Sequence, residues 1–390
     1  MRILKILGLG LLGLLAIAAV IYFFVAPPVL DSQFNTVDKP GPYQVTDRTK
    51  ALYHGLQIVD LHADPLLWDR DLSQRNMRGQ VDLPRMRDAN MALQVFGLVT
   101  KVPAGLNFDR NSSDSDVLPW VVAAQRWPVE TWFGLKARAL YEITKAEKLA
   151  QENDDFTLIK SRSDLDQLLA ARARGEKQMG GLIAFEGIQP IEGEIGNLDL
   201  FFDRGVRMVG LTHFFDNEAG GSAHGWTKGG LTTLGIKAVR KLEALNIAID
   251  LAHASPKLID DVLAIATRPV VVSHTGVKAT CPGPRNLSDD QIRRIASTGG
   301  VLGIGFFEGA VCGKSPSHIA DAMMHVIDLV GASHVALGSD FDGAVSTQFD
   351  ITGLPLIAEE LLARGVSEAD IARIFGQNAL RVLRTLLPEG

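Results

Sequence analysis

Cysteine is almost absent from this sequence, and basic residues are not in excess. Cys281 and Cys312 are the two cysteines among 390 residues, which excludes CxxC zinc frameworks and disulfide-rich scaffolds. The formal net charge is -6 and no Lys/Arg tract is present, so we do not expect nucleic acid as a partner. The HExxH, GxSxG and Walker patterns are also missing, so the zinc, serine-hydrolase and nucleotide sites that they form are not supported.

One long hydrophobic run is present, at the N-terminus. Arg2 and Lys5 precede residues 6–25, a charge-free apolar stretch about as long as a helix that crosses a bilayer. A cleaved signal peptide is the alternative, with small residues at Ala16-Ile17-Ala18. Cleavage there would leave an exposed apolar N-terminus, so we favour an uncleaved membrane anchor over residues 1–26.

The anchor predicts the location of the remaining chain. Positive charges before the apolar run favour the cytoplasmic side, so the rest of the protein is expected at the cytoplasmic membrane, single-pass, facing the periplasm or exterior. Residues 27–50 are rich in Pro, Asp, Gln and Thr without periodicity, and are predicted to be a linker. Residues 51–390 are predicted to be one domain, because 46% hydrophobic residues allow a large core and no inner linker divides them.

Eight apolar segments alternate with helical patterns in this domain. Their apolar content is nearly continuous, as in parallel strands that are buried on both faces. This pattern predicts an α/β fold of the TIM-type (β/α)8 barrel class. The predicted strands are 57–64, 93–100, 180–187, 206–213, 247–255, 269–275, 300–306 and 334–340.

A long interval at 101–179 separates the second and third predicted strands. Residues 141–153 and 163–177 are predicted to be helical, so the interval is a helical insertion, and Trp120, Trp127 and Trp132 lie within it. An insertion at this end of a barrel can cover the active site or pack on the barrel wall, and both alternatives stay open.

The first predicted strand ends in His62-Ala-Asp64. Side chains two residues apart on a strand point to the same side, so this pair offers an imidazole and a carboxylate to one point in space. Active sites of such barrels lie at the C-terminal ends of the strands, and further polar residues occur at these ends. They are Glu186, His213, His253, His274 and Asp340.

This set predicts a metal site. Neutral imidazoles and carboxylates without thiolates suit Zn²⁺ or a similar divalent ion. A single His at a strand end is more often a hydrogen-bonded core or loop residue, and a single Asp there often caps the following helix. His224 follows the fourth strand and is a candidate for substrate contact. The histidines expected to be structural or on the surface are His54, His318, His325 and His334.

These motifs together resemble the membrane dipeptidase (renal dipeptidase) family of zinc peptidases, family M19, which has an amidohydrolase-type barrel. The resemblance runs from about Tyr53 to the C-terminus. It is carried by His62-Ala-Asp64, Phe185-Glu186-Gly187, Leu211-Thr-His213, Asp250-Leu-Ala-His253, Ser273-His274, Pro284-Arg285-Asn286, Gly338-Ser-Asp340 and Phe375-Gly-Gln-Asn.

The resemblance implies a site with two zinc ions bridged by Glu186. His62 and Asp64 would complete the first ion site, and His253 and His274 the second. The ions would share a water or hydroxide that acts as the nucleophile.

Three further residues receive roles from the resemblance. Asp340 would take the proton of the water and pass it to the leaving amine. His213 would polarise the scissile carbonyl and stabilise the oxyanion. Arg285 would bind the carboxylate of the substrate, although from the sequence alone it could equally be a surface charge.

The implied activity is hydrolysis of dipeptides, with small peptides as substrates and a homodimer as a possible assembly. A related amidohydrolase acting on another amide, an N-acyl amino acid or a lactone is the alternative, and a non-catalytic binding protein with an inherited metal site is a minor one. The segments 214–225 and 303–308 depart from the family pattern, which leaves the substrate preference open. Cys281 and Cys312 resemble an intrachain disulfide of the family, with two free thiols as the alternative.

Overall fold

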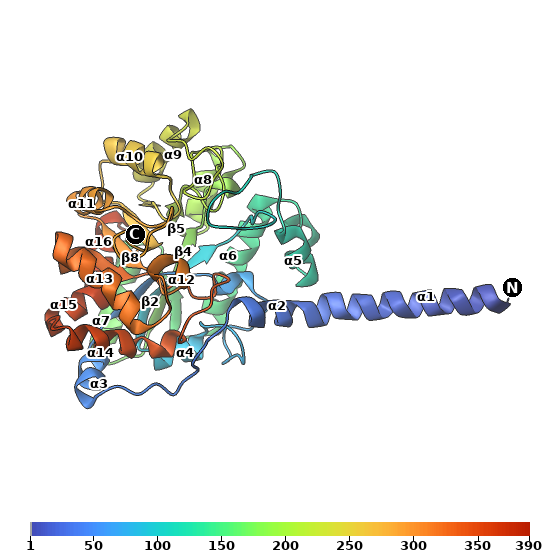
Figure 1. The fold of residues 1–390 in the computed structure, drawn as a ribbon, viewed down its shortest axis with the longest axis horizontal. Coiled ribbons are helices and arrows are strands. Elements are labelled where there is room, and N and C mark those ends of the chain that lie inside the picture. The colour runs from blue at the N-terminus through green and yellow to red at the C-terminus, as the bar shows by residue number, and fades with distance from the viewer. Residues whose placement is uncertain (1) are drawn as a thin grey trace.

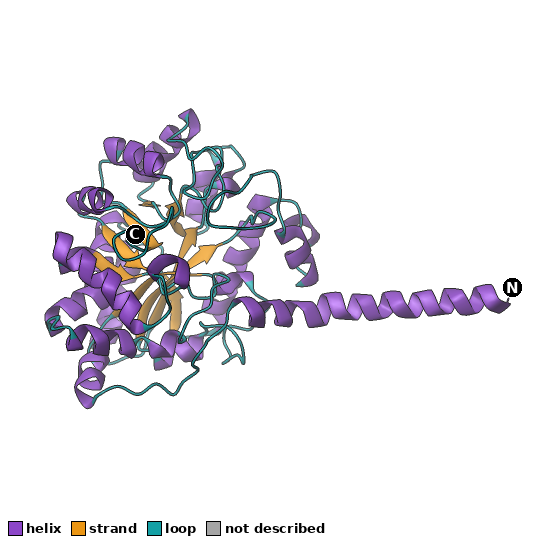
Figure 2. Ribbon diagram, in the orientation of Figure 1, coloured by secondary structure: helices purple, strands orange, loops and turns teal. Residues whose placement is uncertain are grey.

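The computed structural model describes residues 2–390, which form a parallel barrel surrounded by helices (Figure 1). Figure 2 shows the strands at the centre of the domain with helices around them. The strands are β1 (Ile58–Ala63), β2 (Met91–Leu98), β3 (Phe156–Leu158), β4 (Met179–Phe185), β5 (Val206–Gly210), β6 (Ala248–Asp250), β7 (Val271–Thr275), β8 (Val301–Ile304) and β9 (Val335–Leu337).

The sheet closes on itself through the pairing of β2 with β4. Strand order is β2-β1-β9-β8-β7-β6-β5-β4-β3, and β2 also pairs with β4 in parallel register from Leu93 opposite Gly180 to Leu98 opposite Phe185. Eight strands therefore form the closed TIM-type barrel that the apolar segments predict, and that prediction is confirmed. The side chains of all residues in these eight strands are buried, as expected for parallel strands covered on both faces.

The short strand β3 was not expected. It pairs with the first residues of β4, from Phe156 opposite Met179 to Leu158 opposite Gly181, whereas β5 pairs with β4 only from Ile183 onward. β3 thus occupies an edge of β4 that β5 leaves free, outside the closed barrel.

Helices cover the outside of the barrel. Polar caps begin several of them, including Ser288 before α11, where the side chains of Ser288 and Gln291 form a reciprocal capping box. The helices of the domain are α3 (Asp47–His54), α4 (Leu83–Asp88), α5 (Leu118–Ala124), α6 (Leu135–Glu152), α7 (Arg162–Ala173), α8 (Asn197–Asp203), α9 (Thr233–Ala244), α10 (Pro256–Ile265), α11 (Asp289–Ser297), α12 (Glu308–Val311), α13 (Pro316–Val330), α14 (Pro355–Ala363), α15 (Glu368–Ala372) and α16 (Asn378–Leu386).

The insertion between β2 and β4 has two parts that behave differently. Its helices α5 and α6 pack on the barrel side, where Trp127 joins a buried apolar cluster with Trp68 and Val122. The loop before α5, with Leu106 and Phe108, instead lines the cavity at the C-terminal ends of the strands. Both alternatives considered for this insertion therefore apply, each to a different part of it.

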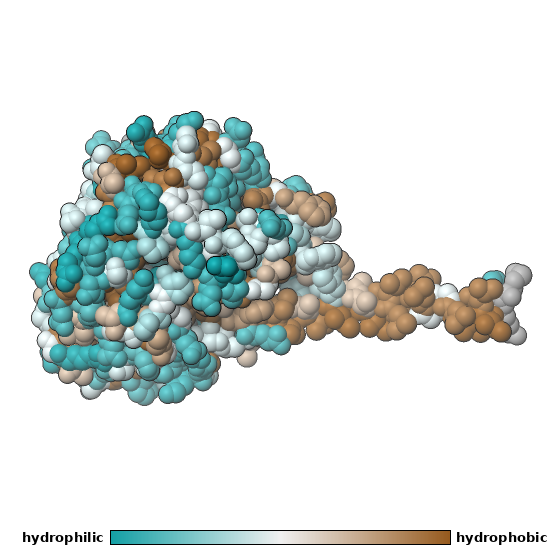
Figure 3. Space-filling view, turned by 45° about the horizontal axis from the view of Figure 1, so that its top comes forward, coloured by the Kyte–Doolittle hydropathy of each residue, from teal (hydrophilic) through white to brown (hydrophobic). Residues whose placement is uncertain are grey.

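A continuous helix projects from the domain at the N-terminus (Figure 1). It consists of α1 (Arg2–Val20), a π-helical turn (Ile21–Val25) and α2 (Ala26–Phe34). The span Ile3–Phe34, 32 residues long, is long and apolar enough to cross a membrane, a property that signal sequences share. Its hydrophobic surface is exposed along the projecting part (Figure 3).

The structure differs from the irregular linker predicted for residues 27–50. The helix continues through the first part of this segment as α2, and Asp31 of α2 is buried. Its Oδ2 lies 3.2 Å from Nε of Arg70 and 2.8 Å from Nε of Arg78. Beyond α2, Val37 forms a parallel bridge with Thr347. Buried ion pairs and backbone pairing thus hold this segment against the domain. Its order comes from contacts with residues distant in sequence, because the segment has no periodic pattern of its own.

Cys281 and Cys312 form a disulfide, with their Cα atoms 5.3 Å apart. The bond joins the loop after β7 to the end of α12, which follows β8. The disulfide implied by the family resemblance is therefore present, and it ties together two loops at the mouth of the barrel.

Candidate metal centre and active site

Seven side chains with metal-binding or acid-base chemistry meet at the C-terminal ends of the barrel strands. All of them come from the set that the sequence predicts, and each is at least 90% buried. They are His62 and Asp64 after or at the end of β1, Glu186 after β4, His213 after β5, His253 after β6, His274 in β7 and Asp340 after β9. The strand alternation and the closed barrel bring residues far apart in sequence to one centre.

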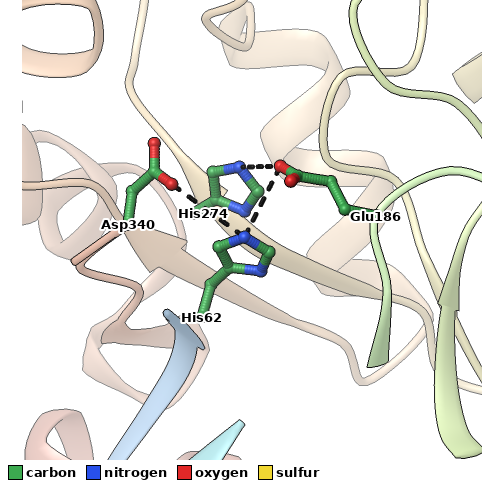
Figure 4. A group of neighbouring side chains, drawn as sticks. All are labelled: His62, Glu186, His274 and Asp340. Atoms are coloured by element: carbon green, nitrogen blue, oxygen red, sulfur yellow. Dashed lines mark ion pairs between the residues drawn. The ribbon is translucent and has the colours of Figure 1, made fainter. Parts of the chain in front are cut away.

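Glu186 lies at the middle of this cluster. Its Oε1 is 3.1 Å from Nε2 of His253 and 3.4 Å from Nε2 of His213. The same oxygen is 3.5 Å from the Nε2 atoms of both His62 and His274. Figure 4 shows the Glu186 carboxylate and the His62 and His274 rings turned toward one another. One carboxylate oxygen facing four imidazole nitrogens is suited to bridge two cations.

The remaining acids lie next to His62. Asp64 Oδ1 is 3.3 Å from His62 Nε2, and Asp340 Oδ1 is 3.9 Å from the same atom. The donor atoms of the cluster fall into two groups that share Glu186. The first group is His62, Glu186, His274 and Asp340, and the second is Glu186, His213 and His253.

This grouping differs in three respects from the ligand sets that the family resemblance implies. Asp340 stands in the first group in place of Asp64, His213 joins the second group, and His274 changes group. His274 falls with His62 by these distances, whereas the resemblance pairs it with His253. The Nε2 atoms of His253 and His274 are nevertheless only 3.0 Å apart. His274 therefore lies between the two groups of donor atoms.

Several atoms of the cluster fit a cation rather than a hydrogen-bonded network. Among the described residues, His62 Nε2 and Asp64 Oδ1 are buried without a hydrogen-bond partner. Burying polar groups without partners is costly unless a ligand satisfies them. Gly97 of β2 leaves the room for this pair, because a Cβ at that position would lie 2.2 Å from Asp64 Oδ1. The donor set suits zinc, with imidazole and carboxylate ligands.

A buried carboxylate fixes the orientation of His274. Asp250 accepts a hydrogen bond of 2.5 Å from the Ser273 hydroxyl, and the Ser273 oxygen is 2.8 Å from Nδ1 of His274. Since the single hydroxyl proton of Ser273 is donated to Asp250, Ser273 accepts from the Nδ1–H of His274. The Nε2 lone pair of His274 is then directed at the cluster, as metal ligation requires.

Asp60 is a second buried carboxylate, and it holds the loop that carries Asp340. It accepts from the backbone N–H and the hydroxyl of Ser339 at 2.8 and 2.6 Å. Asp60, Asp250, Ser273 and Ser339 were not predicted as supporting residues from the sequence. A signal was present, because Asp60 and Asp250 are acidic residues inside apolar strands, two and three positions before a site histidine.

Burial and neighbouring charges set the ionisation of the two central acids. Burial raises the pKa of Glu186, but His213, His62 and the hydrogen bonds from His253 and His274 outweigh it, so its pKa lies well below the usual value. Burial also raises the pKa of Asp340, and the negative charge of Glu186 adds to this effect, so its pKa lies well above the usual value. The lowered pKa keeps Glu186 ionised, which suits a metal ligand. The raised pKa of Asp340 suits a group that carries a proton.

A cavity of about 340 Å³ opens onto the cluster. Glu186, His213 and Asp340 line it, and so does Arg285, which is 5% exposed. Both terminal nitrogens of the Arg285 guanidinium are buried without a hydrogen-bond partner among the described residues. Burial lowers the pKa of Arg285. Its unpaired N–H groups are available to an anionic group in the cavity.

The rest of the cavity wall is largely apolar. Phe214 and Phe307 lie in the segments 214–225 and 303–308 that depart from the family pattern, but no wall residue was predicted individually, because they come from separate loops and are ordinary core residue types. The apolar wall includes Val99, Val102, Leu106, Phe108, Phe214 and Phe307.

His224 does not line this cavity. It lies behind the wall, where its ring stacks on Phe214 with ring centres 4.5 Å apart. Its Nδ1 is 2.7 Å from the backbone oxygen of Phe108, which can only accept, so Nδ1 carries the proton. His224 therefore positions two aromatic wall residues and makes no direct contact with the cavity. His318, His325 and His334 hydrogen-bond to Ser315, Asp289 and the Gly300 carbonyl, away from the site, as expected.

The buried position of His224 is expected to lower the free energy of unfolding in acid. Burial lowers its pKa from 6.5 to about 3 in the folded protein. Between these values the unfolded chain binds the extra proton, so the stabilisation is complete above pH 6.5 and is lost as the pH falls toward 3. His224→Asn keeps a donor for the Phe108 carbonyl but cannot titrate. We expect its free energy of unfolding to fall less with acidification than that of the wild type, by a few kcal/mol.

Denaturant unfolding at a series of pH values measures this difference, with the metal removed from both proteins by the same chelator. His325→Asn is the control for the substitution itself, because His325 is partly exposed and lies away from the site. Identical pH dependence for His224→Asn and the wild type would contradict the prediction.

The closed parallel barrel and its buried imidazole and carboxylate cluster define a metal-dependent hydrolase. Residues 46–387 match the family model described as membrane dipeptidase, peptidase family M19. The chain therefore belongs to the membrane dipeptidase family, and it is a metallo-dipeptidase.

Relatives from fungi and mammals support this assignment. The chain is 35% identical to dipeptidase verJ of Clonostachys rogersoniana over 259 residues, which cover 63% of this chain and 66% of that protein. It is 27% identical to dipeptidase 3 of Mus musculus, over 87% of this chain and 66% of that protein. Its fold is similar to a metallopeptidase of Rhodobacter sphaeroides bound to a phosphinate mimic of L-Ala-D-Ala, with a TM-score of 0.68, 24% identity and coverage of 85% and 99%.

Proposed function

We propose that the chain hydrolyses dipeptides with two zinc ions held by His62, Asp64, Glu186, His253 and His274, with Glu186 shared between them. The proposal is supported by the position of Glu186 Oε1 within 3.5 Å of four imidazole nitrogens. Bound zinc supplies a Lewis acid and lowers the pKa of water enough to give a nucleophile near neutral pH.

Asp340 is the proton carrier in this proposal. Its carboxyl group lines the cavity, and its raised pKa favours holding a proton during the reaction. It accepts the proton of the attacking water and donates it to the nitrogen of the leaving amine. His213 lines the same cavity and donates a hydrogen bond to the oxyanion that forms at the scissile carbonyl.

Arg285 binds the carboxylate of the substrate. The single observation that carries this assignment is a buried guanidinium with unpaired terminal nitrogens in the same cavity as Glu186 and Asp340. A dipeptide would extend from the cluster of imidazoles and carboxylates around Glu186 to this guanidinium, and its side chains would contact the apolar wall. The cavity volume of about 340 Å³ suits a substrate of that size.

Replacement of Arg285 tests the substrate class. We expect Arg285→Ala to raise KM for dipeptides roughly 10-fold to 200-fold, because a charge-assisted hydrogen bond contributes about 1.5–3 kcal/mol. Hydrolysis of the same dipeptides with amidated C-termini should be slow in the wild type and little changed by the substitution. Arg285→Lys should restore only part of the loss, because Lys cannot make the bidentate contact.

Steady-state kinetics on paired free and amidated dipeptides measure this effect, with zinc content determined on the same samples. Arg268→Ala is the matched control, because that Arg contacts Asn246 and the Thr385 carbonyl away from the cavity. Equal losses on free and amidated substrates would contradict the carboxylate role.

We also propose that the N-terminal helix is an uncleaved anchor and that the domain faces the periplasm or exterior. The continuity of the helix into the buried segment around Asp31 supports retention of the anchor. The mass of the protein extracted from membranes tests this, since cleavage after Ala18 would remove most of the apolar stretch.

A further inference from the structure

An exposed apolar surface lies beside the base of the N-terminal helix. It is formed by α5 and the turn that follows it, where the side chains of Trp120, Val129 and Phe133 are 72%, 66% and 82% exposed. Trp120 and Phe133 line the same groove, and exposed apolar side chains that form a contiguous patch mark interaction sites. We call these three residues and Pro119 the α5 patch.

The α5 patch is joined directly to the helix. Tyr22 donates a hydrogen bond of 2.7 Å from its hydroxyl to the backbone oxygen of Trp120. Arg126 donates to the backbone oxygen of Phe23, and its guanidinium lies 5.0 Å from the centre of the Phe24 ring. A groove of about 350 Å³ between helix and domain is lined by Tyr22, Phe23, Pro119, Trp120, Ala123, Trp132 and Phe133.

These contacts set the height of the patch along the helix. Lys5 and Tyr22 are 17 residues apart, which corresponds to roughly 26 Å of α-helix. The hydrocarbon core of a bilayer is about 30 Å thick, so with Lys5 at one boundary Tyr22 lies near the other. Trp120 is at the level of Tyr22, which is the level where Trp and Tyr are enriched in membrane proteins.

The shape of the molecule agrees with this placement. Figure 1 shows α5 as the part of the domain that reaches farthest along the direction of α1. In Figure 3 the hydrophobic surface of the helix continues onto the adjoining part of the domain. A domain held by this helix therefore meets the bilayer first with α5.

We propose that the α5 patch inserts into the interfacial layer of the membrane, so that the catalytic domain binds lipid directly in addition to its anchor. The occupant of this surface is the bilayer interface, where the indole of Trp120 and the rings of Phe133 and Tyr22 meet headgroups and upper acyl chains. The inference rests on the proposed anchor but not on the proposed reaction.

Tryptophan fluorescence of the full-length, zinc-loaded chain in phospholipid vesicles tests the proposal. The helix contains no Trp, and Trp68 and Trp127 are buried, so quenching by lipids brominated near the headgroup reports on domain contact. We expect bromolipid to quench the emission, Trp120→Phe to remove most of the quenched component, and iodide in water to have little effect on it. Trp226→Phe is the matched control, because Trp226 is 62% exposed but does not line the groove.

A second variant probes the same contact without removing the fluorophore. Phe133→Glu should weaken bromolipid quenching of Trp120, because a carboxylate at the interface disfavours insertion. Its exposed position should leave dipeptide hydrolysis unchanged.

Three results would overturn the inference. Quenching by iodide in place of bromolipid would show that the patch faces water. Quenching by neither would show that another protein surface, such as a second copy of the chain, covers it. Failure of the chain to float with the vesicles would overturn the anchor as well, which separates that failure from failure of the patch alone.

Discussion

Replacing Glu186 with Gln should abolish dipeptide hydrolysis and strip the site of metal. Glu186 belongs to both donor groups of the described residues, and its carboxylate oxygen lies 3.1 Å from Nε2 of His253 and 3.4 Å from Nε2 of His213, so its loss affects both groups at once. The amide of Gln is neutral and offers one weak oxygen ligand. Loss of a cation that contributes several kcal/mol to the reaction corresponds to a fall in kcat/KM of about 10⁴-fold or more.

Zinc analysis and hydrolysis assays on the same purified samples measure this effect. We expect about two zinc ions per wild-type chain and clearly fewer in the variant. Glu192→Gln is the matched control, since Glu192 follows the same strand but is exposed and accepts from the backbone N–H of Lys136. A Glu186→Gln variant with full zinc content and normal turnover would refute the shared-ligand role.

Asp340→Asn should separate proton transfer from metal binding. The side chain stays the same size, so the cavity and the zinc content should be preserved. An amide can neither take the proton of water nor return it to the leaving amine. We therefore expect kcat to fall by about 10²-fold to 10⁴-fold while KM changes little, which is the usual contribution of a positioned acid or base.

The pH dependence of kcat provides a further readout for Asp340. Residual activity of the variant should lose the limb of the pH profile that this carboxyl group produces in the wild type. Normal kcat in a fully zinc-loaded Asp340→Asn variant would assign proton transfer to another group.

The barrel and its polar centre were predictable because their signals are local. Each buried parallel strand is a short apolar run, and each active-site side chain stands at the end of one, as His62 and Glu186 do. A periodicity of two and the rule that sites lie at the C-terminal strand ends are enough to bring these residues together.

Features that depend on distant partners were not predictable in the same way. β3 has three residues, too few to show a periodicity. The segment after the apolar run looks irregular because it contains Pro27 and polar residues, yet Asp31 orders it through Arg70 and Arg78, which are 39 and 47 residues away in sequence. The apolar cavity wall was missed because Phe108, Phe214 and Phe307 are gathered from three loops.

The continuous helix has a consequence for where the enzyme can work. A flexible linker of about 24 residues would let a domain move over roughly 25–30 Å above its membrane. Here the ion pairs of Asp31 with Arg70 and Arg78 fix the helix to the domain. In a bilayer, the tilt of the helix therefore sets the distance between the active site and the lipid. The volume of solution that the enzyme samples is then a thin layer over the membrane. Peptides have to diffuse into that layer to be hydrolysed, and the enzyme reaches new substrate by lateral diffusion.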